Sequence, residues 1–450
     1  MIPTLNSYRI YIYPNSVSLY LKSNESIIIS NDGWEILKHC DGTKTIDMIH
    51  TLLNIETEIS KEDLIKFISI AHKKNIIKFI DNFKKEHTKI FGNESSIPPQ
   101  ICSIELTDSC NLECKYCYGE FKRGEGKFWN IEDIKLLFDN LSKIGVIALE
   151  LTGGEPLLHP NFKEILEIAL CKFEVINILS NGVLFDDEVI NIIKEHKHRV
   201  AIQISIDGCS EETNFKVRRV KNTFNKTMNT LKRFREGNVF CNTVYMITEE
   251  NKHEIPDICE LFRKEKLTNL LLSKAAPFGR GCDHKDCLVN KDDETTNMIK
   301  KMLEKYPDIF SKKHYQQQQW YEDAKDMTKF TISNCGTGWK AVSITSNGDV
   351  RSCPLLGEVG KMGNIFKQDI CEITNSDKSR FYLNFSKKHE EKICHNCEYE
   401  YYCAMCITRI YVANLQRIRN GIDLCEIAKR NEMDKYCDFG SNSINFKFTI

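Results

Sequence analysis

The sequence lacks both a strong net charge and any long apolar run. Its 450 residues carry a formal net charge of -1 at pH 7, so no basic field predicts nucleic acid or an anionic membrane as a partner. No apolar stretch approaches the ~18–20 residues that span a bilayer. The first six residues show neither the charged region nor the apolar core of a signal peptide. These absences predict a cytoplasmic protein with no nucleic-acid or membrane partner.

Cysteine, in contrast, is abundant, with twenty residues in the chain. A reducing cytosol disfavours disulfides. The spacing of the cysteines in the sequence therefore has to indicate which of them are metal ligands and which are small, buried apolar residues. Half of the cysteines are scattered, and we interpret most of these as structural. The other half fall in spaced groups: Cys110, Cys114, Cys117, Cys335, Cys353, Cys394, Cys397, Cys403, Cys406 and Cys425.

Residues 1–85 are predicted to form an α+β domain. Alternating apolar residues at 8–13 and 16–20 indicate two strands joined by a turn at Pro14-Asn15. A third strand is expected at 26–30. Three short helices follow, one after Asn31-Asp32-Gly33, one at 45–53 and one from Ser60 to Lys73. This order is winged-helix-like, and the polar residues 86–99 are predicted to be a linker.

Strands and helices alternate between residues 100 and 310, and this pattern predicts a parallel sheet, either open or closed as a full or partial barrel. After residue 311 the pattern weakens, and the cysteine-rich segment 311–450 is expected to be organised by metal clusters. The expected strands are 101–106, 148–151, 175–179, 201–206, 241–246 and 269–272, with helices at 131–144, 163–171, 186–196 and 223–236.

Cys110, Cys114 and Cys117 follow the first of these strands with the spacing Cys-x3-Cys-x2-Cys, and Tyr118 comes next. A zinc knuckle is the alternative, but zinc favours paired Cys-x2-Cys units and four closed ligands. A four-iron cubane bound by three thiolates keeps one iron open for a molecule other than protein. The motif closely resembles that of the radical S-adenosylmethionine (SAM) family. The resemblance implies a partial (β/α)6 barrel in which a [4Fe–4S] cluster and SAM generate a 5′-deoxyadenosyl radical.

A second motif, Gly153-Gly154-Glu155-Pro156, leaves the next expected strand and is similar to the family's Gly-Gly-Glu-Pro motif. By this resemblance Gly153, Gly154 and Glu155 contact the amino end of SAM, Ser180 its ribose, and Tyr118 its adenine. Arg218 matches a position that binds the SAM carboxylate, although Arg219 replaces the glycine that usually follows. Ser205 and Asp207 also match positions that are polar in the radical SAM family. Each of these polar residues has an alternative role as a helix cap or surface group.

The C-terminal cysteines are compatible with zinc on chemistry alone. Together with the first motif they resemble the SPASM domain, which implies two auxiliary [4Fe–4S] clusters. The implied outer ligands are Cys394, Cys397, Cys403 and Cys425, and the implied inner ligands are Cys335, Cys353 and Cys406. Where many relatives carry another cysteine, this chain has Ala341. The fourth inner position is therefore either a remote thiol (Cys282, Cys287 or Cys371) or an open iron that could bind a substrate thiolate.

The stretch around Cys335-Gly336-Thr337-Gly338-Trp339, with Cys353-Pro354, resembles the subtilosin-type (sactipeptide) synthases. This resemblance implies thioether crosslinks from cysteine sulfur to carbon in a ribosomally made precursor peptide, and a reductant such as flavodoxin or ferredoxin. Other radical peptide modifications (carbon–carbon crosslinking, epimerisation, formylglycine formation) remain alternatives. A non-catalytic iron–sulfur electron-transfer protein is a further alternative.

The N-terminal domain resembles a PqqD-like recognition element for precursor peptides. Winged-helix modules often bind DNA, but residues 1–85 contain no concentrated basic helix. We therefore expect this domain to bind the leader part of the precursor as an added strand, at the hairpin formed by residues 8–13 and 16–20.

Overall fold

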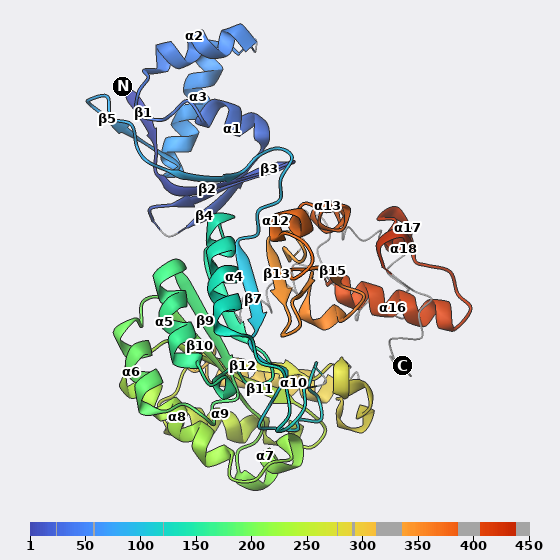
Figure 1. The fold of residues 1–450 in the computed structure, drawn as a ribbon. Coiled ribbons are helices and arrows are strands. Elements are labelled where there is room, and N and C mark those ends of the chain that lie inside the picture. Colours follow the sequence, from blue (N-terminus) through green and yellow to red (C-terminus); the bar gives the residue numbers. More distant parts are fainter. Residues whose placement is uncertain are drawn as a thin grey trace. The chain divides into compact units, whose positions relative to one another are not determined.

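The computed structural model divides the chain into two units, Met1–Pro98 and Pro99–Ile450 (Figure 1). It describes residues 1–23, 25–56, 59–119, 121–276, 278–289, 293–311, 335–385 and 406–437. Each unit encloses apolar cores of its own. None of the helices in these ranges is long and apolar enough to cross a membrane.

The N-terminal unit confirms the expected hairpin. β2 pairs antiparallel with β3, and Tyr13 stands opposite Ser16 across the two-residue turn. Four strands form a sheet in the order β4-β3-β2-β6, and β1 pairs with β5. The six strands are β1 (Ile2–Leu5), β2 (Ser7–Tyr13), β3 (Ser16–Leu21), β4 (Ser26–Ile29), β5 (Ile77–Ile80) and β6 (Lys89–Gly92).

Three helices, α1 (Asn31–Leu37), α2 (Ile46–Glu56) and α3 (Lys61–Lys73), complete this unit. The first begins at Asn31, three residues earlier than expected, because the Ser30 hydroxyl accepts a hydrogen bond from the Gly33 amide at 3.2 Å and caps the helix. Ser60 caps α3 in the same way, as predicted. Trp34 and Leu37 pack on the sheet residues Ile10, Val17 and Leu19.

The expected linker contains a strand. β6 pairs in parallel with β2, so that Arg9 stands beside Lys89 and Ile12 beside Gly92. The compact unit therefore runs to Pro98. As a second consequence, each strand of the hairpin has a neighbour on both sides. Among the described residues, β4 and β6 are the edge strands of this sheet.

The second unit contains the predicted parallel sheet. Its strand order is β12-β11-β10-β9-β8-β7-β13-β14-β15. The strands β7 to β12 run parallel in sequence order, as in a radical SAM barrel. Their bounds are β7 (Ile101–Glu105), β8 (Ala148–Thr152), β9 (Val175–Ser180), β10 (Val200–Ile206), β11 (Cys241–Ile247) and β12 (Leu270–Lys274).

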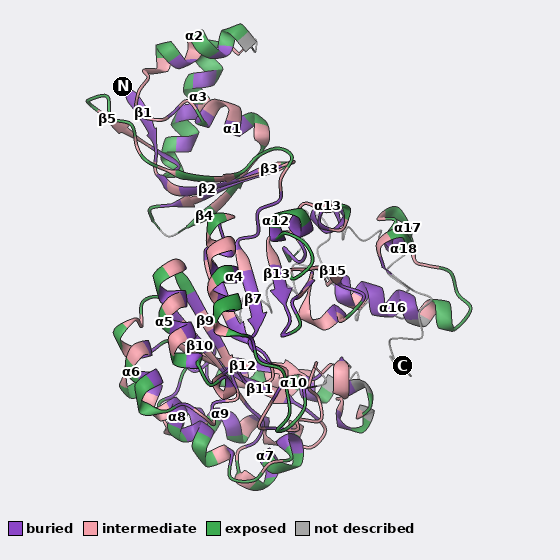
Figure 2. Cartoon of the chain, in the orientation of Figure 1, coloured by how far each residue is buried: buried purple, intermediate pink, exposed green. Residues whose placement is uncertain are grey.

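Amphipathic helices alternate with these strands. Apolar residues at every second strand position, such as Ile104, Leu149 and Ile202, pack against the helices and form the buried core that Figure 2 shows in purple. Four of the helices were predicted, and α7, α9 and α10 were not. The helices are α4 (Ile131–Lys143), α5 (Phe162–Lys172), α6 (Asp187–Glu195), α7 (Glu211–Arg218), α8 (Phe224–Glu236), α9 (Ile255–Lys264) and α10 (Asp293–Lys305).

The sheet continues across the expected domain boundary at residue 311. β13 (Ala341–Ile344) pairs in parallel with β7, and β14 (Asp349–Arg351) and β15 (Lys361–Asn364) follow antiparallel. The C-terminal region therefore shares backbone hydrogen bonds with the first core strand. Its described helices are α12 (Ile370–Thr374), α13 (Asp377–Asn384), α16 (Ile407–Arg419), α17 (Glu426–Arg430) and α18 (Met433–Tyr436). The last four pack in a second core, whereas α12 packs in the first core through Ile370 and Ile373.

Candidate functional site

The cysteine loop leaves the carboxyl end of β7 and is tied to the loop that follows β8. The amides of Gly154 and Glu155 donate hydrogen bonds to the carbonyls of Thr107 and Ser109, at 2.8 and 2.9 Å. Ligand sites of parallel α/β folds lie at this edge of the sheet. The two motifs that the sequence singled out therefore lie side by side.

Steric crowding explains why residues 153 and 154 are both glycine, which the sequence alone did not reveal. A Cβ atom at Gly153 would lie 2.4 Å from the Thr107 carbonyl oxygen, and one at Gly154 would lie 2.1 Å from that of Ser109. Gly153 also has a φ of 135°, which disfavours any other residue. Both glycines are thus needed for the cysteine loop to approach β8, and their expected contact with SAM stays a prediction.

The three thiols of the loop form a donor set suited to a metal cluster. Burial, together with the Glu155 carboxylate, raises the pKa of Cys110 to about 12. Burial also raises the pKa of Cys114 and Cys117. The charges of Cys110 and Cys117 oppose ionisation of Cys114, so the free thiols cannot readily become thiolates together. A bound metal reverses this preference because it stabilises the deprotonated thiol.

Within the described ranges, no three His, Cys, Asp or Glu side chains are arranged to hold a single metal ion. A cubane makes a different demand, because each of its irons takes one cysteine and the thiols need not converge on one point. The Leu112 amide donates a hydrogen bond to Cys110 Sγ at 3.4 Å, which helps to orient the thiol. The loop therefore fits the cluster that its sequence motif implies.

Glu155 is buried beneath the loop, where both carboxylate oxygens accept hydrogen bonds. Ser180 Oγ donates to Oε1 at 2.8 Å, and the Asn181 amide donates to Oε2 at 2.9 Å. Burial nevertheless raises the pKa of Glu155 to about 7. The structure thus brings Glu155 and Ser180 together, as expected for residues of one site, and their contacts with SAM stay predictions.

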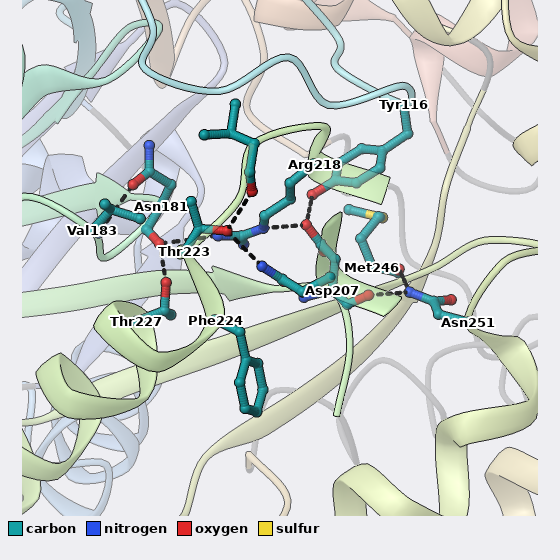
Figure 3. Close-up of polar contacts among 12 residues, drawn as sticks. Tyr116, Asn181, Val183, Asp207, Arg218, Thr223, Phe224, Thr227, Met246 and Asn251 are labelled. Atoms are coloured by element: carbon teal, nitrogen blue, oxygen red, sulfur yellow. Dashed lines mark hydrogen bonds and ion pairs between the residues drawn. The ribbon is translucent and has the colours of Figure 1, made fainter. Parts of the chain in front are cut away.

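Asp207 and Arg218 form a buried ion pair that also binds the cysteine loop (Figure 3). Arg218 Nε donates to Asp207 Oδ2 at 2.6 Å, and the Tyr116 hydroxyl donates to the same oxygen at 2.8 Å. The side chains of Arg218 and Asp207 are 1% and 0% exposed. Asp207 Oδ1 is buried without a hydrogen-bond partner in the described part of the chain. This oxygen suits a ligand that donates a hydrogen bond, as the amino and hydroxyl groups of SAM do.

The end of α7 supports the cysteine loop through its backbone. The amides of Glu113 and Lys115 donate to the carbonyls of Arg218 and Val217, at 3.1 and 3.2 Å. Arg219, which follows, adopts the left-handed conformation with a φ of 60°. This is the conformation that glycine favours, so Arg219 keeps the backbone shape of the usual glycine at a cost of roughly 1–2 kcal/mol.

Several contacts to the loop were missed by sequence reasoning. Asn181 Nδ2 donates to Asn111 Oδ1 at 2.7 Å. Arg280 Nη1 donates to the Cys114 carbonyl at 3.1 Å, and its Nη2 donates to the Phe121 carbonyl. Tyr116 lies inside the motif, and its place between two cysteines was an available signal. No local pattern indicates Arg280.

The two remaining expected cofactor residues lie apart from this network. Tyr118 packs edge-to-face on Phe121, with ring centroids 5.5 Å apart. Like Trp339, it also packs against the C-terminal core. Ser205 lies in β10 beside Val244 of β11. Their contacts with SAM stay predictions.

Three of the C-terminal cysteines lie near one another. Burial raises the pKa of Cys353 to about 11, and the charges of Cys406 and Cys335 contribute to this rise. Cys425 is the N-cap residue of α17, and its Sγ accepts a hydrogen bond from Asn414 Nδ2 at 3.3 Å. The other expected outer ligands lie outside the described residues: Cys394, Cys397 and Cys403.

The candidates for a fourth inner ligand have other surroundings. Glu250, Asp286 and Lys115 surround the thiol of Cys287. Cys371 lies at the start of α12, beside Asp369. The side chain of Cys282 lies outside the described residues. Ala341 occupies the first position of β13.

Two family models match the chain. Residues 104–262 match the radical SAM superfamily, and residues 335–398 match the iron–sulfur cluster-binding domain called SPASM. With the fold and the cysteine loop described above, these matches define the chain as a radical SAM enzyme with a SPASM domain. Enzymes of this class bind SAM and a [4Fe–4S] cluster, and SPASM domains bind auxiliary iron–sulfur clusters.

Among curated proteins, the chain is similar to the antilisterial bacteriocin subtilosin biosynthesis protein AlbA of Bacillus subtilis. The two are 26% identical over 96% of this chain and 98% of AlbA. The sporulation killing factor maturation protein SkfB of the same organism is 27% identical over 63% of this chain and 67% of SkfB. Among solved structures, Streptococcus suis SuiB bound to precursor peptide SuiA has the same fold. Its TM-score is 0.63 at 14% identity, over 94% of this chain and 99% of SuiB.

Proposed function

We propose that this enzyme forms intramolecular thioether crosslinks between cysteine sulfur and carbon in a ribosomally made precursor peptide. The observation that carries this proposal is the group Cys335, Cys353 and Cys406, a second three-thiol group in the same unit as the cysteine loop. Ala341 stands where a further ligand is common. The similarity to AlbA along nearly the whole chain supports the same reaction.

The bound cluster and SAM supply a 5′-deoxyadenosyl radical, and an external electron donor such as flavodoxin or ferredoxin is part of the proposal. The chain's own residues hold the loop that binds them. Its own Tyr116 and Asn111 form hydrogen bonds with Asp207 and Asn181, and the end of α7 accepts hydrogen bonds from its backbone amides. Arg280 donates a further hydrogen bond to the Cys114 carbonyl. A rigid loop keeps the reacting atoms in position, which accounts for a large part of enzymatic rate enhancement.

The direct test is the reaction of the reconstituted, reduced enzyme with SAM and a cysteine-rich precursor peptide. Mass spectrometry should show loss of a pair of hydrogen atoms for each crosslink, and the crosslinked cysteine should resist alkylation. Crosslinking that leaves every peptide thiol free to react would contradict the proposal. Failure to form 5′-deoxyadenosine would instead favour a non-catalytic electron-transfer protein.

We further propose that the N-terminal unit binds the leader of the precursor. The hairpin strands were the expected site, but β2 and β3 each have neighbours on both sides. β4 is an edge strand of this sheet in the described residues, and Ile28 on it is 59% exposed. An added peptide strand would form main-chain hydrogen bonds to this edge and bury Ile28.

Replacing Ile28 with aspartate is expected to weaken precursor binding about tenfold, because burying one large apolar side chain contributes roughly 1.5–3 kcal/mol. Fluorescence anisotropy with a labelled leader peptide measures this change. Ile55→Asp is the matched control, since Ile55 on α2 is 79% exposed. SAM cleavage without peptide should stay unchanged in both variants. Equal affinity of the Ile28 and Ile55 variants would exclude β4 as the binding edge.

A further inference from the structure

A polar row crosses one face of the central sheet, from the core strands into the C-terminal strands. Ser103 of β7 pairs with Glu150 of β8 on one side and with Ser343 of β13 on the other. Ser343 in turn pairs with Arg351 of β14. Paired residues point to the same face of a sheet. The residues between them, such as Ile104 and Val342, belong to the apolar core on the opposite face.

Two polar atoms on this face, Ser343 Oγ and Arg351 Nε, are buried without a hydrogen-bond partner among the described residues. The guanidinium of Arg351 pairs with Glu358 through Nη2, at 3.0 Å. Glu105 lies two positions beyond Ser103 on the same face and is only 5% exposed. Buried polar groups are normally paired, and groups left unpaired in this way suit a polar ligand.

Glu105 interacts electrostatically with the cysteine loop and with the strand that precedes Cys353. Its charge acts on Cys117 and Tyr118 of the cysteine loop. From the other side, the positive charge of Arg351 acts on Glu105. Two residues beyond Arg351 the chain reaches Cys353, which packs against the same C-terminal core as Tyr118. A peptide held between the cysteine loop and Cys353 would therefore meet Glu105.

We propose that Glu105 is the catalytic base that accepts the proton of the peptide cysteine thiol, while Arg351 and Ser343 bind the peptide's backbone carbonyl groups. This inference rests on the proposed thioether function. The S–H bond breaks, the sulfur keeps the electron pair, and the Glu105 carboxylate becomes a neutral carboxylic acid. The proton returns to solvent when the product leaves.

The surroundings of Glu105 suit this role. Burial raises its pKa to about 7; the positive charge of Arg351 limits the rise, and the negative charge of Asp108 adds to it. A base acts best when its pKa lies near the working pH. The other buried carboxylates of the site are already engaged, since Glu155 accepts hydrogen bonds at both oxygens and Asp207 pairs with Arg218.

The test compares Glu105→Gln with Glu150→Gln, the same substitution in the same polar row. The Glu105 variant should still form 5′-deoxyadenosine and take deuterium from labelled peptide. Its crosslinking rate should fall at least about 100-fold, the usual contribution of a general base. Wild-type crosslinking should rise with pH to a plateau above about 7, and the variant should lose this dependence. Glu105→Asp should restore part of the rate, and Glu150→Gln should stay near wild type.

A second measurement does not depend on activity. A carboxyl whose pKa is raised in the folded state contributes stability below its unfolded pKa, and this contribution is lost as pH rises through the folded value. The melting temperature of Glu105→Gln should therefore exceed that of wild type increasingly between about pH 4.3 and pH 7, and by a constant amount above. A melting curve with no such difference would contradict the buried, protonatable Glu105.

The outcomes separate this inference from the proposed function. Wild-type rates and pH profile in Glu105→Gln would overturn the base assignment, and so would loss of 5′-deoxyadenosine formation in that variant. A wild-type product with unmodified peptide cysteines would overturn the thioether function itself, and with it the thiol as the source of the proton.

Discussion

Replacing Arg218 with methionine should lower the free energy of unfolding of the second unit by about 3–5 kcal/mol, because Asp207 would remain as an unpaired buried charge. Among the described residues, only the Tyr116 hydroxyl would then donate a hydrogen bond to the Asp207 carboxylate. Because Tyr116 belongs to the cysteine loop, we expect the loop to become less rigid as well. Urea denaturation of the protein without iron measures the first effect. The rate at which a chelator removes iron from the reconstituted protein measures the second.

The chain offers a matched control on its surface. Arg233 pairs with Asp187, whose side chain is 89% exposed, and exposed pairs contribute only about 0–1 kcal/mol. Arg233→Met should therefore change stability little. Adding Asp207→Asn to Arg218→Met should recover part of the loss, because it removes the unpaired charge. Equal stability of the Arg218 and Arg233 single variants would refute the role given to the buried pair.

Replacing Cys114 or Cys353 with alanine should distinguish SAM cleavage from formation of the thioether. Cys114→Ala removes one ligand of the three-thiol loop, and we expect loss of about four iron atoms per chain and of 5′-deoxyadenosine formation. Cys353→Ala leaves this loop intact. It should keep SAM cleavage and lose the thioether product, because the inner cysteine group would be incomplete. Iron analysis, 5′-deoxyadenosine yield and peptide mass are measured on each variant.

Cys171→Ala is the control for the cysteine variants, because Cys171 lies exposed on α5, away from the spaced groups. It should match wild type in iron content, SAM cleavage and product. Full crosslinking by Cys353→Ala would show that the inner group is not required. SAM cleavage by Cys114→Ala at the wild-type rate would contradict the cluster assignment of the loop.

The sequence predicted the core of the fold because its signals are local. Apolar residues at alternating positions mark β7 to β12, and the Ser60 cap marks the start of α3. Edge strands have weaker sequence patterns. The residues of β6 are mostly exposed and lie in a polar stretch of sequence, so this segment was expected to be part of a linker. β13 was missed because four residues with little periodicity become a strand only when β7 is beside them.

The same distinction applies to the site. The cysteine and glycine motifs are short patterns that can be recognised in isolation. The pairing of Tyr116 with Asp207 joins residues 91 positions apart, and that of Arg280 with Cys114 joins residues 166 apart. Such contacts form only once the sheet has folded, so composition and spacing do not predict them. The left-handed Arg219 was missed for a similar reason, since only surrounding packing makes that conformation acceptable.

Because β13 pairs with β7, the cysteine loop and the C-terminal cysteine region are joined by one continuous sheet. A chain cut near residue 311 would leave the edge of β7 with unpaired amides and carbonyls, which is a template for aggregation. The pairing also sets a fixed spacing, because adjacent strands lie about 4.7–4.9 Å apart. The segment that leads to Cys353 is thus held by backbone hydrogen bonds at a constant offset from the strand that leads to Cys110. An enzyme that evolves to accept a new substrate can therefore change the side chains between the two sites while the distance between the sites stays the same.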